Sequence, residues 1–203
     1  SAEDGYKNHL MRIDTNSFEI VETMPTRIDY NIRDMAFDYT TGTMYGVAEG
    51  GNVDGSLCQI NLTTGEVTLL GDTGRGMATL TCDADGQLYT ITSSGDLCKI
   101  DKYTSEFTLI KHVTSDASGY QSMHYDHVTG NTYWGSASLA LVDLETGDVS
   151  TLGYIGGTYM LVGCVFTQPS QEVEPKVPET TAVTGVSLPD RAAVVVGETS
   201  QFQ

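Results

Sequence analysis

Basic side chains are scarce in this sequence. Its 203 residues contain 10 Lys and Arg against 27 Asp and Glu, which gives a formal net charge of −17 at pH 7. A surface this acidic repels nucleic acid and anionic membranes, so neither is an expected partner. The negative charge instead suits solubility outside the cell, with cations or neutral polymers as partners.

Long apolar runs and catalytic signatures are also lacking. No apolar run approaches 18 residues, so we expect no membrane-spanning helix. No Ser/His/Asp set, Cys/His pair or glycosidase-type carboxylate pair can be assigned, and no glycine-rich phosphate loop joins a strand to a helix. We therefore assign no catalytic residue, no metal ligand and no cofactor. The chain starts at Ser1 rather than at Met, which predicts a processed start.

Two interleaved hairpin patterns are present instead. The first occurs four times, as RIDTNSFEI (12–20), QINLTTGEV (59–67), KIDKYTSEF (99–107) and LVDLETGDV (141–149). The second occurs three times, as MAFDYTTGTMY (35–45), LTCDADGQLY (80–89) and MHYDHVTGNTY (123–133). Apolar and polar residues alternate around each turn, which is the pattern of half-buried strands. We expect one apolar face in every copy, with Ile13, Ile60, Ile100 and Val142 at equivalent positions.

The turns of these hairpins share a glycine. An Asp or Asn begins each turn, where its side chain accepts a hydrogen bond from the backbone two residues on. The glycine that follows takes the positive φ of a type I turn with a bulge. The glycines at this position are Gly42, Gly65, Gly86, Gly130 and Gly147. Phe18 and Ser105 occupy this position in two copies, so we expect those two turns to be strained or differently shaped.

The repeat spacing predicts the fold. Two hairpins per unit of about 40–45 residues are typical of a β-propeller blade, with four antiparallel strands named A to D from the axis outward. The second hairpin is then A–B and the first is C–D. We predict an all-β propeller over residues 1–167, with three complete blades and one composite, incomplete blade.

Closure of the ring is open to three alternatives. TYMLVGCVFT (158–167) reads as a last strand A without a strand B after it. We favour a four-bladed ring in which residues 8–13 and 160–167 lie in one sheet. An arc completed by another chain, or an arc that lacks further blades, are the other two.

The four cysteines fit core positions of the repeat. Cys58 and Cys98 align with Met11 and Ala140, Cys82 aligns with Phe37 and Tyr125, and Cys164 lies in the last apolar strand. Equivalent positions in neighbouring blades stand about 10 Å apart, too far for a disulfide. We therefore expect small, buried, unpaired thiols.

Two segments resemble metal sites at first sight. MHYDH (123–127) holds His124, Asp126 and His127, but Asp126 is the turn residue of the repeat. We expect the two histidines on opposite faces of a strand, which would rule out a shared metal. EGGNVDGS (49–56) offers oxygen ligands but lacks the distal Glu of a calcium loop.

Composition changes after residue 167. QPSQEVEPKVPETTA (168–182) is rich in Pro and acids, which predicts a semi-rigid linker. Residues 183–203 alternate again, and VTGVSL (183–188) and VGET (196–199) resemble the start of bacterial group 2 immunoglobulin-like domains. About 20 residues cannot complete such a domain. The resemblance implies a stalk module of a bacterial surface or secreted protein.

Departures from the repeat give the candidate binding residues. The B–C and D–A connections of a propeller share one face, and aromatic and basic residues of this chain gather there. They are Tyr30, Arg33, Arg75, Tyr120, Trp134 and Tyr159. Trp134 replaces Gly46 and Thr90 at its repeat position. Aromatic rings with a few polar neighbours suit stacking on sugar rings or peptides.

The propeller repeats themselves resemble the divergent repeats of bacterial surface proteins, through the wording FDYTTGTMY (37–45). This resemblance implies an exported or cell-surface protein and specifies no ligand. We expect it to bind, adhere or display without catalysis, with a glycan, polysaccharide or host protein as ligand. The alternative is a hydrolase or lyase acting on extracellular polysaccharide. A carboxylate pair facing across the central opening would favour the enzyme, and an aromatic, carboxylate-poor face would favour the binder.

Overall fold

The computed structural model describes residues 8–50, 53–71, 76–115, 119 and 121–154, and every regular element among them is a β-strand. No helix in this part of the chain is long and apolar enough to cross a membrane. The predictions for residues 155–203, namely the strand at 160–167, the linker and the immunoglobulin-like segment, lie outside the described residues, as does Cys164.

The strands form three four-stranded antiparallel sheets and one two-stranded sheet. Each four-stranded sheet is a blade with its strands in the order A to D. Blade 1 is β3 (Asn31–Asp38), β4 (Thr43–Gly50), β5 (Val53–Ile60) and β6 (Val67–Gly71). Blade 2 is β7 (Thr81–Cys82), β8 (Leu88–Ile91), β9 (Asp96–Ile100) and β10 (Phe107–His112). Blade 3 is β11 (Ser122–Tyr125), β12 (Thr132–Gly135), β13 (Ser138–Val142) and β14 (Val149–Tyr154), and the two-stranded hairpin is β1 (Asn8–Ile13) with β2 (Ile20–Ile28).

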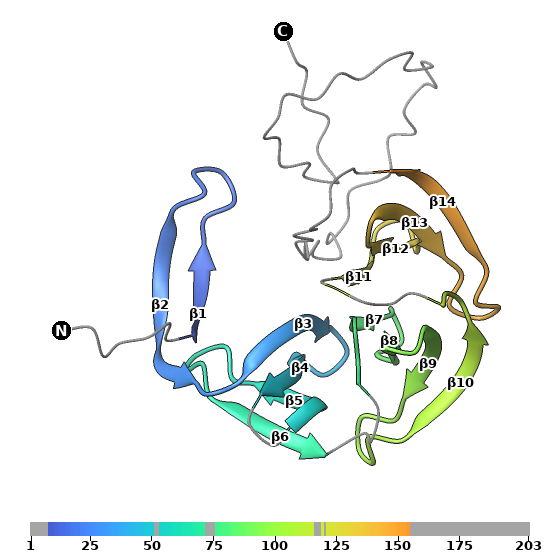
Figure 1. Cartoon of the computed structure of the whole chain (residues 1–203). Helices are drawn as coiled ribbons and strands as arrows, with labels where there is room; N and C mark the ends of the chain where they lie inside the picture. The colour runs from blue at the N-terminus through green and yellow to red at the C-terminus, as the bar shows by residue number, and fades with distance from the viewer. Residues whose placement is uncertain (1–7, 51–52, 72–75, 116–118, 120, 155–203) are drawn as a thin grey trace, which may run out of the picture.

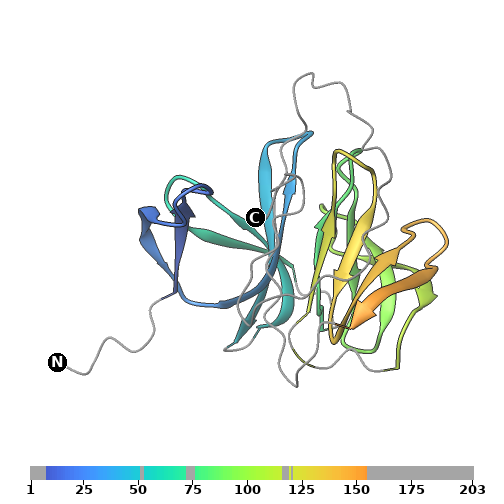
Figure 2. The ribbon, with the colours of Figure 1, turned by 90° about the horizontal axis from the view of Figure 1, so that it is seen from above.

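This is the propeller architecture that the repeat predicts. The three complete blades are confirmed, and β1–β2 is the C–D hairpin of the composite blade. The blades follow one another around an arc with their A strands innermost, and β1–β2 and β14 lie at its two ends (Figure 1). The view from above again separates this first hairpin from blade 3 (Figure 2).

The apolar face of the C–D hairpin is confirmed in three copies. Ile60, Ile100 and Val142 are buried, and so are Cys58, Cys82 and Cys98, which confirms these thiols as core residues. The prediction is wrong for the first copy, where Met11 is 45% exposed and Ile13 is 52% exposed. The reason is that β1–β2 lies at the end of the arc, where its other face packs on blade 1 and no described blade covers the face of Met11 and Ile13 (Figure 1).

The turn geometry of the repeat is regular. All five turn glycines have positive φ, between 69° and 79°. Phe18 and Ser105 take the same left-handed conformation, with φ of 57° and 60°. The two exceptional turns therefore keep the shape of the others and carry the backbone strain of a side chain at positive φ.

Contacts between blades explain why this position is small. A Cβ on Gly65 would lie 2.9 Å from Met24 Cβ of β2, and a Cβ on Gly147 would lie 2.6 Å from Lys111 Cβ of β10. Each C–D turn thus packs against the outer strand of the preceding blade. In blade 2 the partner is small instead, because Ser105 faces Gly71 of β6. Phe18 is tolerated at this position because its side chain is 64% exposed and does not have to fit against any strand that the structure describes.

A buried ion pair also joins two blades. Lys102, in the C–D turn of blade 2, donates to Asp38 Oδ2 of β3 at 2.7 Å and to the Gly86 carbonyl at 3.1 Å. The Asp38 side chain is fully buried. Burial alone would raise the pKa of this carboxyl, but Lys102 and the hydroxyls of Thr40 and Thr41 lower it to about 2. Asp38 is therefore ionised at neutral pH and holds its own turn and Lys102 of the next blade by hydrogen bonds.

The three A strands converge on one carboxylate. Asp34 of β3 is buried, and its Oδ2 accepts the backbone N–H of Leu80 at 2.8 Å and that of Met123 at 3.1 Å. Its Oδ1 accepts the Ser122 hydroxyl at 3.0 Å. One side chain therefore ties the inner strands of blades 1, 2 and 3 together and sets the geometry of the central opening.

Candidate functional site at the axial opening

A pocket lies where the inner strands of the three blades run into their A–B turns. Its lining comprises ten residues from β3, β7, β11 and the following turns, and none is Asp or Glu. They are Met35, Ala36, Phe37, Tyr39, Thr81, Cys82, Met123, His124, Tyr125 and His127. The enclosed space is about 10 Å³, room for one water molecule, so a ligand would lie over the rim.

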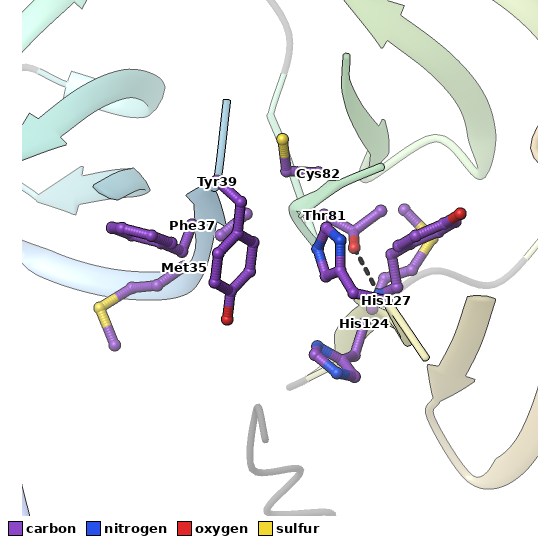
Figure 3. Close-up of a pocket in the computed structure, with 10 residues that line it drawn as sticks. Met35, Phe37, Tyr39, Thr81, Cys82, His124 and His127 are labelled. Atoms are coloured by element: carbon purple, nitrogen blue, oxygen red, sulfur yellow. Dashed lines mark hydrogen bonds between the residues drawn. The ribbon is translucent and has the colours of Figure 1, made fainter. Parts of the chain in front are cut away.

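Aromatic rings form a continuous chain around this rim. Phe37 and Tyr39 meet edge to face with their centroids 4.8 Å apart, and Tyr39 meets His127 at 4.6 Å. His127 in turn meets Tyr125 at 4.9 Å. Figure 3 shows the rings of Tyr39 and His127 facing each other across the opening, from blades 1 and 3. All four rings are partly exposed, so each has some surface that a ligand could contact.

A hydrogen bond between blades supports the floor of the pocket. The Tyr125 backbone N–H of β11 donates to the Thr81 hydroxyl of β7 at 2.8 Å (Figure 3). Thr81 and Cys82 are buried, and their short strand fills the space between blades 1 and 3. The rim is therefore built on paired strands rather than on loops alone, which holds the rings in place.

His124 and His127 both border this pocket. Only His124 lies on β11, which ends at Tyr125, so the expectation that both belong to one strand is wrong. The two rings point in different directions (Figure 3), and it is His127 that meets Tyr39 and Tyr125. Burial lowers the pKa of both imidazoles, which favours their neutral form near pH 7. Each neutral imidazole offers one hydrogen-bond donor and one acceptor.

Asp126 has the turn role that the repeat predicts. Its carboxylate accepts the Thr129 hydroxyl at 2.6 Å and the Val128 backbone N–H at 2.9 Å. No group of three or more His, Cys, Asp or Glu side chains in the described part of the chain is placed to hold a metal ion. Glu49 of the calcium-like segment contacts the guanidinium of Arg33 instead.

Two of the predicted binding residues, Tyr30 and Arg33, lie at the other end of the inner strands. Arg33 of β3 pairs with Glu49 and donates to the Gly119 carbonyl at 2.7 Å, which links blade 1 to the loop before β11. Tyr30 is half-buried beside the core of blade 1. Arg75, Tyr120 and Tyr159 lie outside the described residues.

Trp134 is a core residue in this structure. Its indole is 6% exposed, packs among Ile91, Leu97 and Met123, and donates from Nε1 to Gln121 Oε1 at 2.9 Å. Stacking of this ring on a ligand would require it to leave the core. The replacement of Gly46 and Thr90 by Trp134 is thus explained by packing within blade 3 and by one buried hydrogen bond.

The sequence did hold a signal for the axial site. Tyr39, Ala84 and His127 occupy the same position, directly after the turn aspartate, and two of the three are aromatic. The same comparison places Asp34 at the position of Thr79 and Ser122. Both departures from the repeat point to the axis, whereas all of our candidate binding residues were expected on the opposite face.

Comparison with known proteins supports the fold. No family model and no curated protein matches the chain in sequence. Similar solved structures include a protein of unknown function from Bacteroides thetaiotaomicron, with 17% identity and a TM-score of 0.50 over 68% of this chain and 36% of that one. They also include the nidogen/laminin complex, with 15% identity and a TM-score of 0.55 over 73% of this chain and 59% of that one. The chain spans less than two thirds of either solved chain.

Proposed function

We propose that this chain is a non-enzymatic binding module of an exported bacterial surface protein, and that its ligand lies over the axial pocket. The observation that carries the proposal is the chain of four partly exposed rings, Phe37, Tyr39, His127 and Tyr125, contributed by two blades. Ordered aromatic faces are the usual means by which proteins hold sugar rings and peptide side chains.

The chemistry of the rim indicates a neutral ligand. The Tyr39 hydroxyl and the two imidazoles provide donors and acceptors beside apolar ring faces, which is the combination a glycan requires. The acidic surface of the chain would repel polyanions. We therefore place a neutral polysaccharide or glycan first and a peptide of a host protein second. The likeness to the chain in the nidogen/laminin complex, itself a complex between proteins, supports the peptide.

The alternative function is a hydrolase or lyase that acts on extracellular polysaccharide. Such chemistry commonly uses two carboxylates that face each other across the substrate. The ten residues of the axial lining supply aromatic rings and imidazoles in that place, which favours binding. Asp34 of β3 accepts hydrogen bonds from Met35, Leu80, Ser122 and Met123. Asp38 and Asp126 hold their turns, so these carboxylates serve the fold.

The remainder of the proposal concerns the parent protein. Residues 168–182 would act as a linker and residues 183–203 as the start of an immunoglobulin-like stalk domain at the cell surface. Neighbouring stalk domains of the parent chain would then position the propeller. Arg75, Tyr120 and Tyr159 would extend a second aromatic and basic surface around Arg33 and Tyr30 on the opposite face.

A glycan array and a peptide array test the proposal with four proteins. Wild type should retain a neutral glycan or a peptide, and Tyr39→Ala should weaken that binding roughly tenfold, as expected for loss of one stacked ring. Tyr103→Ala is the matched control, because Tyr103 is 82% exposed in a turn remote from the pocket. Ligand binding that survives both Tyr39→Ala and His127→Ala would exclude the axial site.

A further inference from the structure

Neighbouring blades meet at their outer edges through one repeated contact. The glycine position of each C–D turn meets the preceding blade, at the residue six positions after that blade's own turn position. The three contacts are Gly65 with Met24, Ser105 with Gly71, and Gly147 with Lys111. One residue of each pair is glycine, because a Cβ in its place would come within 3.0 Å of the partner's side chain.

Two members of this series stand without such a contact in the described part of the chain. Phe18 is the turn position of the first hairpin, and Gly153 lies six positions after the turn position of blade 3. Gly153 pairs with Leu139 beside a bulge, just as Gly71 pairs with Leu57, so it has the register of the contact position. A Cβ on Gly153 would meet no described atom within 4 Å, and the Phe18 side chain is largely exposed. Once more, one residue of the two is glycine.

The core between blades 1 and 2 shows what the surfaces around these two residues require. It buries Ile100 of blade 2, and Leu70 of blade 1 packs against it. Ile13 has the position of Ile100 in the first hairpin, and Leu152 has the position of Leu70 in blade 3. Both are more than half exposed. The first hairpin therefore presents the half of an interface that faces a preceding blade, and blade 3 presents the half that faces a following blade.

Contacts at the axis indicate that one chain brings these two halves together. Blades 1 and 3 touch directly, through the Ser122 hydroxyl on Asp34 at 3.0 Å and the rings of Tyr39 and His127 at 4.6 Å. Because the central opening widens with each added blade, alternate blades can meet in this way only in a small ring, and four blades are the low end of the range. The first hairpin already packs on blade 1, and Figure 1 shows it across the opening of the arc from β14.

We propose that the ring closes within one chain by packing of the Phe18 side chain over Gly153 of blade 3. The closed interface buries the apolar face with Ile13 against Leu152, which stabilises it. The same burial offsets the strain of an aromatic residue at a φ of 57°, where the other turns hold glycine or serine. A second copy is the poorer partner, because two chains that each carry a net charge of −17 repel one another.

A double-mutant cycle in the full chain, measured by urea denaturation, tests the contact. Gly153→Met should raise the equilibrium constant for unfolding at least tenfold, because the new side chain collides with Phe18. In the Phe18→Gly background the same change should raise it less than threefold, since this combination reproduces the pair of Gly65 and Met24. The matched control background is Tyr103→Gly, an exposed aromatic in the turn that packs on blade 1. There Gly153→Met should act as it does in the wild type.

Equal effects of Gly153→Met in the wild type and in the Phe18→Gly background would overturn the proposal, because residues that do not touch give additive changes. A second measurement needs no variant and records nuclear Overhauser effects between the Phe18 ring protons and the Gly153 α-protons. In a mixture of isotope-labelled and unlabelled chains, these effects should arise within the labelled chains alone. Their absence would overturn the contact. Effects that pass between labelled and unlabelled chains would assign it to a second copy and overturn closure within one chain.

Discussion

At the scale of the residue, one turn position shows how blade packing selects side chains. Gly65 and Gly147 leave room for the outer strand of the preceding blade, so a Cβ would collide with Met24 or Lys111. In blade 2 the room comes from Gly71 instead, and the turn position becomes Ser105. Ser105 has a φ of 60°, and its buried hydroxyl has no hydrogen-bond partner among the described residues.

Ser105→Gly should therefore stabilise the protein. The change removes the strain of positive φ, about 1–2 kcal/mol, and an unsatisfied hydroxyl, against an entropic cost of about 0.4–1 kcal/mol from glycine in the unfolded chain. We predict a net gain of about 1 kcal/mol in the free energy of unfolding, measured by urea denaturation. A loss of stability would show that the packing of Ser105 on Gly71 outweighs its strain.

The Asp38–Lys102 pair predicts a pH dependence of stability. The folded pKa of Asp38, about 2, lies below its ordinary value of 3.8, so its stabilisation is present above pH 3.8 and is lost as pH falls through 3.8 toward 2. The total is roughly 2 kcal/mol, of which about 1 kcal/mol is lost by pH 3. Unfolding free energies of wild type and Asp38→Asn at pH 5 and pH 3 measure it.

The wild type should lose about 1 kcal/mol more than Asp38→Asn between these pH values. Equal losses would mean that Lys102 and the two threonines do not hold the carboxylate as described. Lys102→Met provides the second comparison, since it removes the ammonium and leaves the carboxyl able to titrate. Like Asp38→Asn, it should reduce the loss of unfolding free energy between pH 5 and pH 3.

At the scale of the element, the three A strands depend on Asp34. Replacement by alanine removes the acceptor of two buried backbone N–H groups, those of Leu80 and Met123, and of the Ser122 hydroxyl. Each donor left unsatisfied costs about 1–3 kcal/mol. We predict that Asp34→Ala lowers the unfolding free energy by roughly 3 kcal/mol or more in urea denaturation.

The control for this prediction is Asp29→Ala, two residues before β3. The Asp29 side chain is 77% exposed and forms only a surface pair with Arg27 at 3.7 Å. Its loss should change stability by less than about 0.5 kcal/mol. Similar effects of the two substitutions would remove Asp34 from its central role.

The strands and turns of the blades show which features the sequence could predict and which it could not. Hairpins are local, so repeated turn aspartates and glycines were enough to predict blade strands and their pairing. The axial pocket depends on which residues of different blades meet, such as Tyr39 and His127, and this follows from blade rotation rather than from any local pattern. Trp134 misled for a related reason: its rarity in the repeat indicated a ligand, whereas the core of blade 3 uses it.

At the scale of the whole molecule, the two ends of the arc remain to be joined. The face of β1–β2 with Met11 and Ile13 is exposed, and Leu152 and Tyr154 are exposed on β14 at the other end. Residues 160–167 lie outside the described part, so the four-bladed ring stays a prediction. In that ring these residues lie in the same sheet as β1, and we propose that they pair with its edge, which no described strand covers.

Hydrogen exchange can test this pairing in the full chain and in a chain that ends at Tyr154. Alternate amides of β1 should lose protection in the shorter chain, while β8 and β9 keep theirs. Unchanged protection of β1 would contradict the ring. Protection that rises with protein concentration would favour an arc completed by a second molecule.

The most direct measurement for the account as a whole uses the four histidines as reporters. His124 and His127 line the axial pocket, whereas His9 and His112 lie on the outer hairpin β1–β2 and on β10. A glycan or peptide retained on the arrays would be titrated while the imidazole resonances are followed by NMR. We predict saturable shifts of His124 and His127 with His9 and His112 unchanged. Saturable binding that leaves His124 and His127 unshifted would contradict an axial binding site.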